Sequence, residues 1–181
     1  MSFVEKKLEE QLIYEGRIFN VYHSTVSLPD GTEAPRDYIN HHGGAGILPI
    51  TDRKTVFLVR QYRIGVEKEL LEIPAGKLEK GEDPLETAKR ELEEEIGYIP
   101  QKILPLGHME LSPAYLGELT YLFIATDLKK GQAHLDEGEF LAVEEYPFDE
   151  VLRMVMEGEI TDGKTQNTIL KAALLMQQGI L

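Results

Sequence analysis

The sequence predicts an α/β fold in which a mixed sheet packs between helices, preceded by an N-terminal antiparallel strand extension. Strand-like runs lie on both sides of one well-defined central helix, and further helical spacing follows near the C-terminus. That order of elements is typical of an α/β sandwich. A chain of 181 residues is also the size of one domain with a substantial core.

The first forty residues are strand-like. Residues 18–28 and 32–40 flank a Pro29-Asp30-Gly31 turn and read as an antiparallel hairpin, with a further strand at 11–14. We therefore expect a strand extension over 1–40 and the main domain over 41–181. Beyond the extension, alternating and apolar runs predict strands at 45–50, 56–62, 70–75, 102–110, 119–126 and 140–146. Helical spacing recurs at 148–157 and 164–178.

The central helix has clear local limits. Asp83 is a good N-cap, Pro84 suits the first helical position, and Glu86 stands where a capping box requires an acid. Gly97 can end the helix in the left-handed conformation. At about 100° per residue, one narrow stripe of this helix would face a core; it comprises Leu85, Ala88, Leu92 and Ile96.

Two sets of charged residues flank that stripe. Glu86, Lys89 and Glu93 read as a solvated face with weak pairing along the helix. On the other flank, Glu91, Glu94 and Glu95 would repel one another beside apolar packing, and Arg90 is expected to offset one of them at most. A hard divalent cation bound by the carboxylate oxygens would neutralise the remaining negative charge. Mg²⁺ or Mn²⁺ is the usual ion where phosphate is present.

The amino-acid composition limits the kinds of molecule that the protein is expected to bind. The formal net charge of −13 disfavours nucleic acid, and any phosphorylated substrate would need metal ions and placed arginines. Candidates for the latter are Arg36, Arg60 and Arg63, together with Arg17. There is no cysteine for a thiolate site, and no secretory or membrane-spanning run is visible, so we expect a cytoplasmic protein without a membrane partner. The His41-His42 pair lacks a partner at ligand spacing and reads as a turn or surface feature.

The central segment resembles the Nudix box of the Nudix hydrolases, with Tyr98 as its one departure, at a packing position. The resemblance rests on the spacing of Gly76, Glu82, Arg90-Glu91-Leu92, Glu94-Glu95 and Gly97. It implies a Nudix α/β/α sandwich with a loop, helix, loop catalytic motif. It also implies Mg²⁺-dependent hydrolysis of a nucleoside diphosphate linked to another moiety. By the same resemblance, the metal ligands are Glu91, Glu95, Glu94 and the carbonyl of Ala75, while Arg90 and Glu82 hold the motif in shape.

Features outside the box resemble the ADP-ribose pyrophosphatases of this family. Pro113 lies sixteen residues past Gly97, and the segments 71–76 and 59–63 also match that branch. The implied reaction is hydrolysis of ADP-ribose to AMP and ribose 5-phosphate by a homodimer that exchanges the N-terminal segment. The substrate-binding residues expected on this basis are Phe19, Arg36, Arg60, Arg63, Glu72 and Pro113.

The same branch takes its general base from an acidic loop after the box, which residues 135–140 match here. We favour Glu139, which directly precedes the returning strand, over Glu137, with Glu118 or a box glutamate as the remaining choices. Alternative substrates are a nucleotide sugar, a dinucleotide or an oxidised nucleoside triphosphate. The alternative from another class is a ligand-binding regulator without turnover, although this chain keeps every box glutamate.

Overall fold

The computed structural model describes residues 2–181 and divides into two compact units. The first comprises residues 2–43 with 110–119, and the second comprises 44–109 with 120–181. The 110–119 loop therefore groups with the N-terminal strands, a link that the sequence does not reveal. Exchange of residues 1–40 between subunits stays a prediction. Within residues 2–181 no helix is long and apolar enough to cross a membrane.

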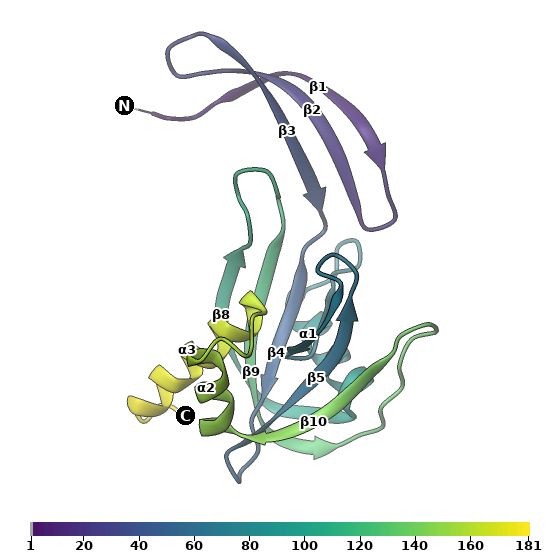
Figure 1. Cartoon of the computed structure of the whole chain (residues 1–181), viewed down its shortest axis with the longest axis vertical. Helices are drawn as coiled ribbons and strands as arrows, with labels where there is room; N and C mark the ends of the chain where they lie inside the picture. Colours follow the sequence, from purple (N-terminus) through teal and green to yellow (C-terminus); the bar gives the residue numbers. More distant parts are fainter. Residues whose placement is uncertain (1) are drawn as a thin grey trace. The chain divides into compact units, whose positions relative to one another are not determined.

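In the first unit, β1 (Lys6–Glu15), β2 (Phe19–Ser27) and β3 (Glu33–His41) form one antiparallel sheet in that order (Figure 1). β1 is longer than the four residues expected at 11–14. All ten of its residues are exposed, so burial imposes no pattern on its sequence. Its first half is highly charged, so no alternation of apolar and polar residues signals it. The 110–119 loop binds β3, since the Ile39 N–H donates to Tyr115 O at 2.7 Å and the Gly117 N–H donates to Ile39 O at 2.9 Å.

The second unit holds two sheets. The mixed one has the order β7-β4-β9-β8, with β4 (Gly44–Pro49) parallel to β9 (Leu119–Lys130) and antiparallel to β7 (Ala75–Lys77), beside β8 (Tyr98–Glu110). The other is antiparallel, with β5 (Thr55–Arg63) between β10 (Leu141–Pro147) and β6 (Lys68–Glu72). The strand expected at 70–75 is interrupted, because Pro74 has no N–H to donate to a ladder.

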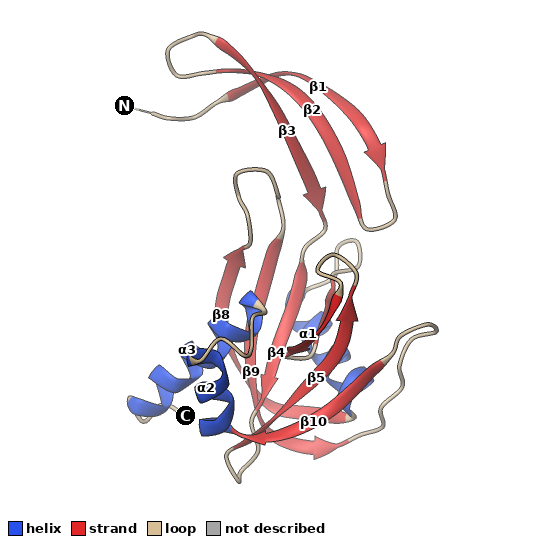
Figure 2. Cartoon of the chain, in the orientation of Figure 1, coloured by secondary structure: helices blue, strands red, loops and turns tan. Residues whose placement is uncertain are grey.

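Helices cover both faces of these strands (Figure 2). One core joins α2 (Phe148–Met156) and α3 (Gly163–Gln177) to strand residues such as Leu48, Leu58 and Leu122. The other joins α1 (Pro84–Ile96) to the adjacent positions Ile47, Phe57 and Phe123. Because successive side chains of a strand point to opposite faces of the sheet, each central strand contributes residues to both cores. The predicted α/β sandwich with a mixed sheet is confirmed.

Candidate active site

The loop, helix, loop motif forms as its local signals predict. Asp83 Oδ1 accepts from the Leu85 N–H at 2.8 Å, and Gly97 ends α1 with φ 71° while donating to Glu93 O at 2.9 Å. Glu86 contacts Lys89 at 2.7 Å instead of completing a capping box. The expected core stripe is buried at Ala88, Leu92 and Ile96. This packing fixes which way the acidic flank of the helix points.

Glu95 is the most deeply buried acid of the motif, with 2% of its surface exposed. Its Oε2 accepts from the Ala75 N–H at 3.1 Å, whereas Oε1 is buried without a hydrogen-bond partner in residues 2–181. Burial, followed by the charges of Glu91 and Glu139, raises the pKa of Glu95 to about 9. An ionised carboxylate there needs a cation close to its free oxygen.

Glu91 lies directly against Gly76, the glycine that opens the box. A Cβ added to Gly76 would stand 1.7 Å from Glu91 Oε1, so any larger residue there would displace this carboxylate from its position. Burial raises the pKa of Glu91, and Glu94 and Glu139 add to the rise while Arg90 opposes it. The loop before α1 and the helix itself thus pack around two carboxylates whose pKa values are raised.

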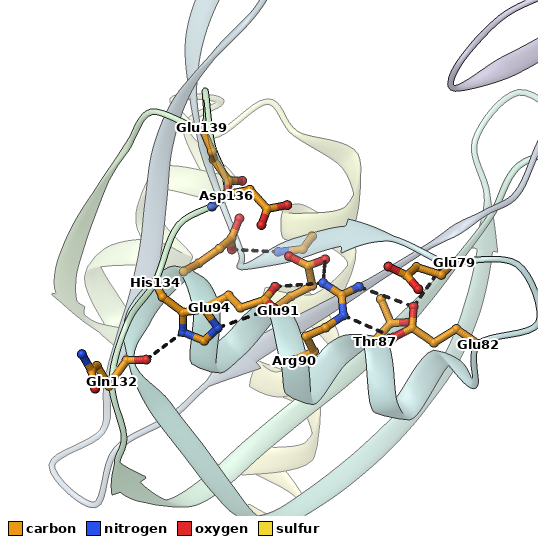
Figure 3. Close-up of polar contacts among 12 residues, drawn as sticks. Glu79, Glu82, Thr87, Arg90, Glu91, Glu94, Gln132, His134, Asp136 and Glu139 are labelled. Atoms are coloured by element: carbon orange, nitrogen blue, oxygen red, sulfur yellow. Dashed lines mark hydrogen bonds and ion pairs between the residues drawn. The ribbon is translucent and has the colours of Figure 1, made fainter.

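Arg90 links the acids to one another (Figure 3). Its Nη1 donates to Glu91 Oε1 and to Glu94 Oε2, both at 2.8 Å, and its Nε donates to Glu82 Oε1 at 3.3 Å. The Nη1 group of Arg90 thus contacts two box glutamates, although its single positive charge can offset only one of their negative charges, as expected. The contact with Glu82 ties the helix to the preceding loop, in line with a shaping role for both residues.

The donor set suits a hard divalent ion, although in residues 2–181 no three Asp, Glu, His or Cys side chains form a ready cluster. Arg90 instead holds Glu91 and Glu94 together. The unpartnered Glu95 Oε1 and the space that Gly76 leaves around Glu91 are the features that fit a cation. Oxygen-only ligands match Mg²⁺ or Mn²⁺ rather than a thiolate-binding ion.

The segment that leads into the acidic loop, residues 131–134, is hydrogen-bonded to the end of α1. The Gly131 N–H donates to Gly97 O at 2.8 Å, and the His134 N–H donates to Glu94 O at 2.9 Å. Further along, the Asp136 N–H donates to Glu139 Oε2 at 3.3 Å, and Figure 3 shows Glu139 on the side of the box glutamates. Glu139, rather than Glu137, is the loop acid among the main charges that raise the pKa values of Glu91 and Glu95.

The arginines of β5 are held by acids that sequence reasoning did not pair with them. Arg63 donates from Nε and Nη2 to the two carboxylate oxygens of Glu72, each at 2.7 Å, and Lys164 also binds Glu72. Although burial alone would raise the pKa of Glu72, Arg63 and Lys164 together lower it. Arg60 Nε donates to Glu144 Oε1 at 2.6 Å. Among the side-chain contacts of residues 2–181, the Arg63–Glu72 pair alone joins two of the predicted substrate residues.

The remaining predicted substrate residues lie in the first unit. Phe19 is 39% exposed and its ring centroid lies 6.0 Å from that of Tyr14. Arg36 donates to Glu5 from Nε at 2.9 Å and from Nη2 at 2.6 Å. Pro113 is in the 110–119 loop that binds β3. The metal candidates and the two loop glutamates favoured as base, by contrast, belong to the second unit, whereas Glu118 belongs to the first.

Comparison with known proteins decides the family. The family model described as NUDIX domain matches residues 40–165. The chain belongs to the Nudix family. This Nudix hydrolase is 37% identical over 183 residues to a Bacillus subtilis (strain 168) protein named ADP-ribose pyrophosphatase, covering 98% of this chain and 99% of the relative. It is 41% identical over 165 residues to the methanol dehydrogenase activator of Bacillus methanolicus, covering 90% and 89%.

The fold has a solved counterpart. A crystal structure described as an ADP compounds hydrolase superposes with a TM-score of 0.85 over 100% of both chains at 22% identity. At that identity the likeness concerns the fold, which includes the N-terminal strands as well as the Nudix sandwich. The family membership expected from the spacing of the box is therefore confirmed.

Proposed function

We propose that this Nudix hydrolase cleaves the pyrophosphate of ADP-ribose to AMP and ribose 5-phosphate with Mg²⁺, Mn²⁺ being the other ion that its ligands suit. The observation that carries the proposal is the pair of carboxylates at the centre of the box, the half-buried Glu91 against Gly76 and the buried Glu95 with one free oxygen. The near-full-length likeness to a protein named ADP-ribose pyrophosphatase supports the choice of substrate.

A bound divalent ion would neutralise pyrophosphate oxygens and so let water approach phosphorus. Its proposed ligands are Glu91, Glu95, Glu94 and the Ala75 carbonyl. Glu139 accepts a proton from the attacking water, whose oxygen bonds to one phosphorus as the bridging P–O bond breaks. The released bridging oxygen stays on the other phosphate and takes up a proton, which gives AMP and ribose 5-phosphate.

The side chains proposed to contact the substrate are mainly charged arginines and one exposed aromatic ring. Arg60 and Arg63 lie on β5, and their guanidinium groups would contact phosphate oxygens, for which a planar guanidinium is well shaped. Phe19 and Arg36 would contact the adenosine part. Pro113 and Glu72 are assigned to the substrate by resemblance alone, and Glu72 is already bonded to Arg63 and Lys164.

Product analysis tests the proposal. The protein is incubated with ADP-ribose and Mg²⁺, with Glu91→Gln as the matched inactive control, and AMP and ribose 5-phosphate are separated and quantified. Parallel reactions contain GDP-mannose, a dinucleotide and an oxidised nucleoside triphosphate. Fastest turnover of ADP-ribose is expected. Faster turnover of another compound would make that compound the preferred substrate in place of ADP-ribose. If none of the compounds were hydrolysed, the proposed catalytic activity would be contradicted.

A regulatory role is the second candidate, because one relative is named as an activator of methanol dehydrogenase. Adding this protein to a purified methanol dehydrogenase, with and without Mg²⁺, would test whether it raises the dehydrogenase rate. The Glu91→Gln variant distinguishes the mechanisms, since activation that survives this change would be independent of hydrolysis. No change in dehydrogenase rate under any condition would rule the role out for that partner.

We further propose that the protein acts in the cytoplasm as a homodimer. β1 is exposed along its whole length and forms one edge of its three-stranded sheet. Exposed apolar side chains accompany that edge, among them Leu8, Leu12 and Ile13. An uncovered edge with apolar residues is a surface that proteins normally pair or cover, and a second copy of the chain would do so.

A further inference from the structure

The first turn of α3 forms a closed set of polar contacts. Asp162 caps the helix, with Oδ2 accepting from the Thr165 N–H at 2.9 Å and from the Thr165 hydroxyl at 2.6 Å. Its other oxygen, Oδ1, accepts from Lys164 Nζ at 3.0 Å. Asp162 thus binds both Lys164 and Thr165. These contacts within the helix fix the orientation of the two side chains.

Both side chains then bind the segment just before the box. Lys164 Nζ donates to Glu72 Oε2, and Thr165 Oγ1 accepts from the Ile73 N–H at 2.9 Å. Thr165 is fully buried and Glu72 is 1% exposed, so water cannot replace these contacts. Two consecutive residues of α3 therefore hold two consecutive residues that lie 92 positions earlier in the chain.

The segment held in this way leads directly to the box glutamates. Pro74 O accepts from the Ile47 N–H at 2.9 Å, and the next residue, Ala75, donates its N–H to Glu95 Oε2 at 3.1 Å. Gly76 follows and lies against Glu91. The position of residues 75 and 76 relative to both carboxylates therefore depends on the contacts of Glu72 and Ile73 with α3.

We propose that Lys164 and Thr165 are positioning residues for the divalent-metal site, holding residues 72–76 at the spacing that Glu91 and Glu95 require. The inference rests on the proposed metal-dependent hydrolysis and deepens it, because it assigns part of the site to a helix far outside the box. Residues that orient metal ligands typically change metal affinity or activity by about 10–100-fold when altered.

Direct Mn²⁺ binding, followed by electron paramagnetic resonance of the free ion, tests the inference without relying on turnover. The variants are Lys164→Met and Thr165→Val, with Thr165→Ser as the conservative variant that keeps the hydroxyl. Lys171→Met is the matched control, since Lys171 lies on the same helix and donates to Leu106 O at 3.0 Å, away from the box. Thermal unfolding of each protein is measured alongside.

We expect Mn²⁺ affinity to fall about 10–100-fold in Lys164→Met and Thr165→Val. Thr165→Ser should restore it, and kcat should recover at saturating metal. Wild-type affinity in Thr165→Val, or an equal loss in Lys171→Met, would overturn the inference, as would a lowered Tm with unchanged affinity. If Lys164→Met did not fold, the comparison of Thr165→Val with Thr165→Ser would test the inference by itself. A wild-type protein that binds no Mn²⁺ would instead contradict the proposed function.

Discussion

Gly76 and Glu91 are in such close contact that a Cβ on the glycine would stand 1.7 Å from the carboxylate oxygen Oε1. The atom in the way is the far end of a flexible side chain, so a larger residue at 76 would move Glu91 rather than unfold the strand. This glycine therefore shapes the proposed metal site and contributes little to the fold.

Gly76→Ala should accordingly lower kcat by about 10–100-fold, the range for changes that misplace a metal ligand. The far-ultraviolet circular dichroism spectrum should match that of the wild type, and the Tm should change little. Gly81→Ala is not a suitable control because Gly81 has φ 82°, whereas Gly65→Ala is, since open space surrounds that residue. Full activity in Gly76→Ala would contradict the assigned role of Glu91.

Glu91→Gln and Glu95→Gln should each reduce turnover by orders of magnitude while the fold survives. Each change keeps the shape of the side chain and removes a negatively charged oxygen from the proposed ligand set. Steady-state rates at several Mg²⁺ concentrations provide the measurement, and Glu86→Gln, on the solvated flank of α1, serves as the control. Near-normal activity of either variant at saturating Mg²⁺ would argue against the ligand assignment.

The raised pKa of Glu95 makes the stability of the metal-free protein depend on pH. Between the ordinary value of 4.5 and about 9, the folded state keeps a proton that the unfolded state has lost. The free energy of unfolding therefore falls as pH rises through this window. Thermal unfolding in a chelator from pH 5 to pH 9 should show a steeper fall for wild type than for Glu95→Gln. Parallel curves would show that Glu95 is not the cause.

The choice between the two loop glutamates can be tested by substitution. Glu139→Gln should lower kcat by about 10²–10⁴-fold and leave Mg²⁺ and ADP-ribose binding almost intact, because it removes a proton acceptor and not a ligand. Glu137→Gln should cost less, since Glu139 is the loop acid with a main electrostatic effect on Glu91 and Glu95. The reverse order would assign the base to Glu137, and two mild effects would move it to Glu118 or a box glutamate.

Light scattering at micromolar concentration should give the mass of a dimer. If the N-terminal segment completes the site of the second copy, mixing Arg36→Ala with Glu91→Gln under exchange conditions should restore part of the activity that each variant lacks. Restoration is expected because one of the two sites in a mixed dimer would carry neither change. A fully active monomer would contradict the dimer, and an active dimer without complementation would contradict action across the interface.

Local rules predicted much of the molecule. The bounds of α1 follow from Asp83, Pro84 and Gly97, whose effects act within one turn of the helix. The apolar stripe and the acidic flank follow from helical periodicity, and the family follows from residue spacing in the box. Central strands such as β4 were predictable because burial on both faces leaves a continuous apolar run.

Other features depend on contacts between distant parts of the chain. The pairing of Glu72 with Lys164 and of Arg60 with Glu144 leaves no periodic trace in the sequence, so neither was predicted. The reach of Arg90 to a second glutamate was also missed, because it depends on rotamers set by packing. The sequence by itself determined the helix, the acids on its flank and the family, since these depend on short-range spacing. Only the tertiary structure decided how deeply each acid is buried and which cation faces it, because burial and pairing arise when distant segments pack together.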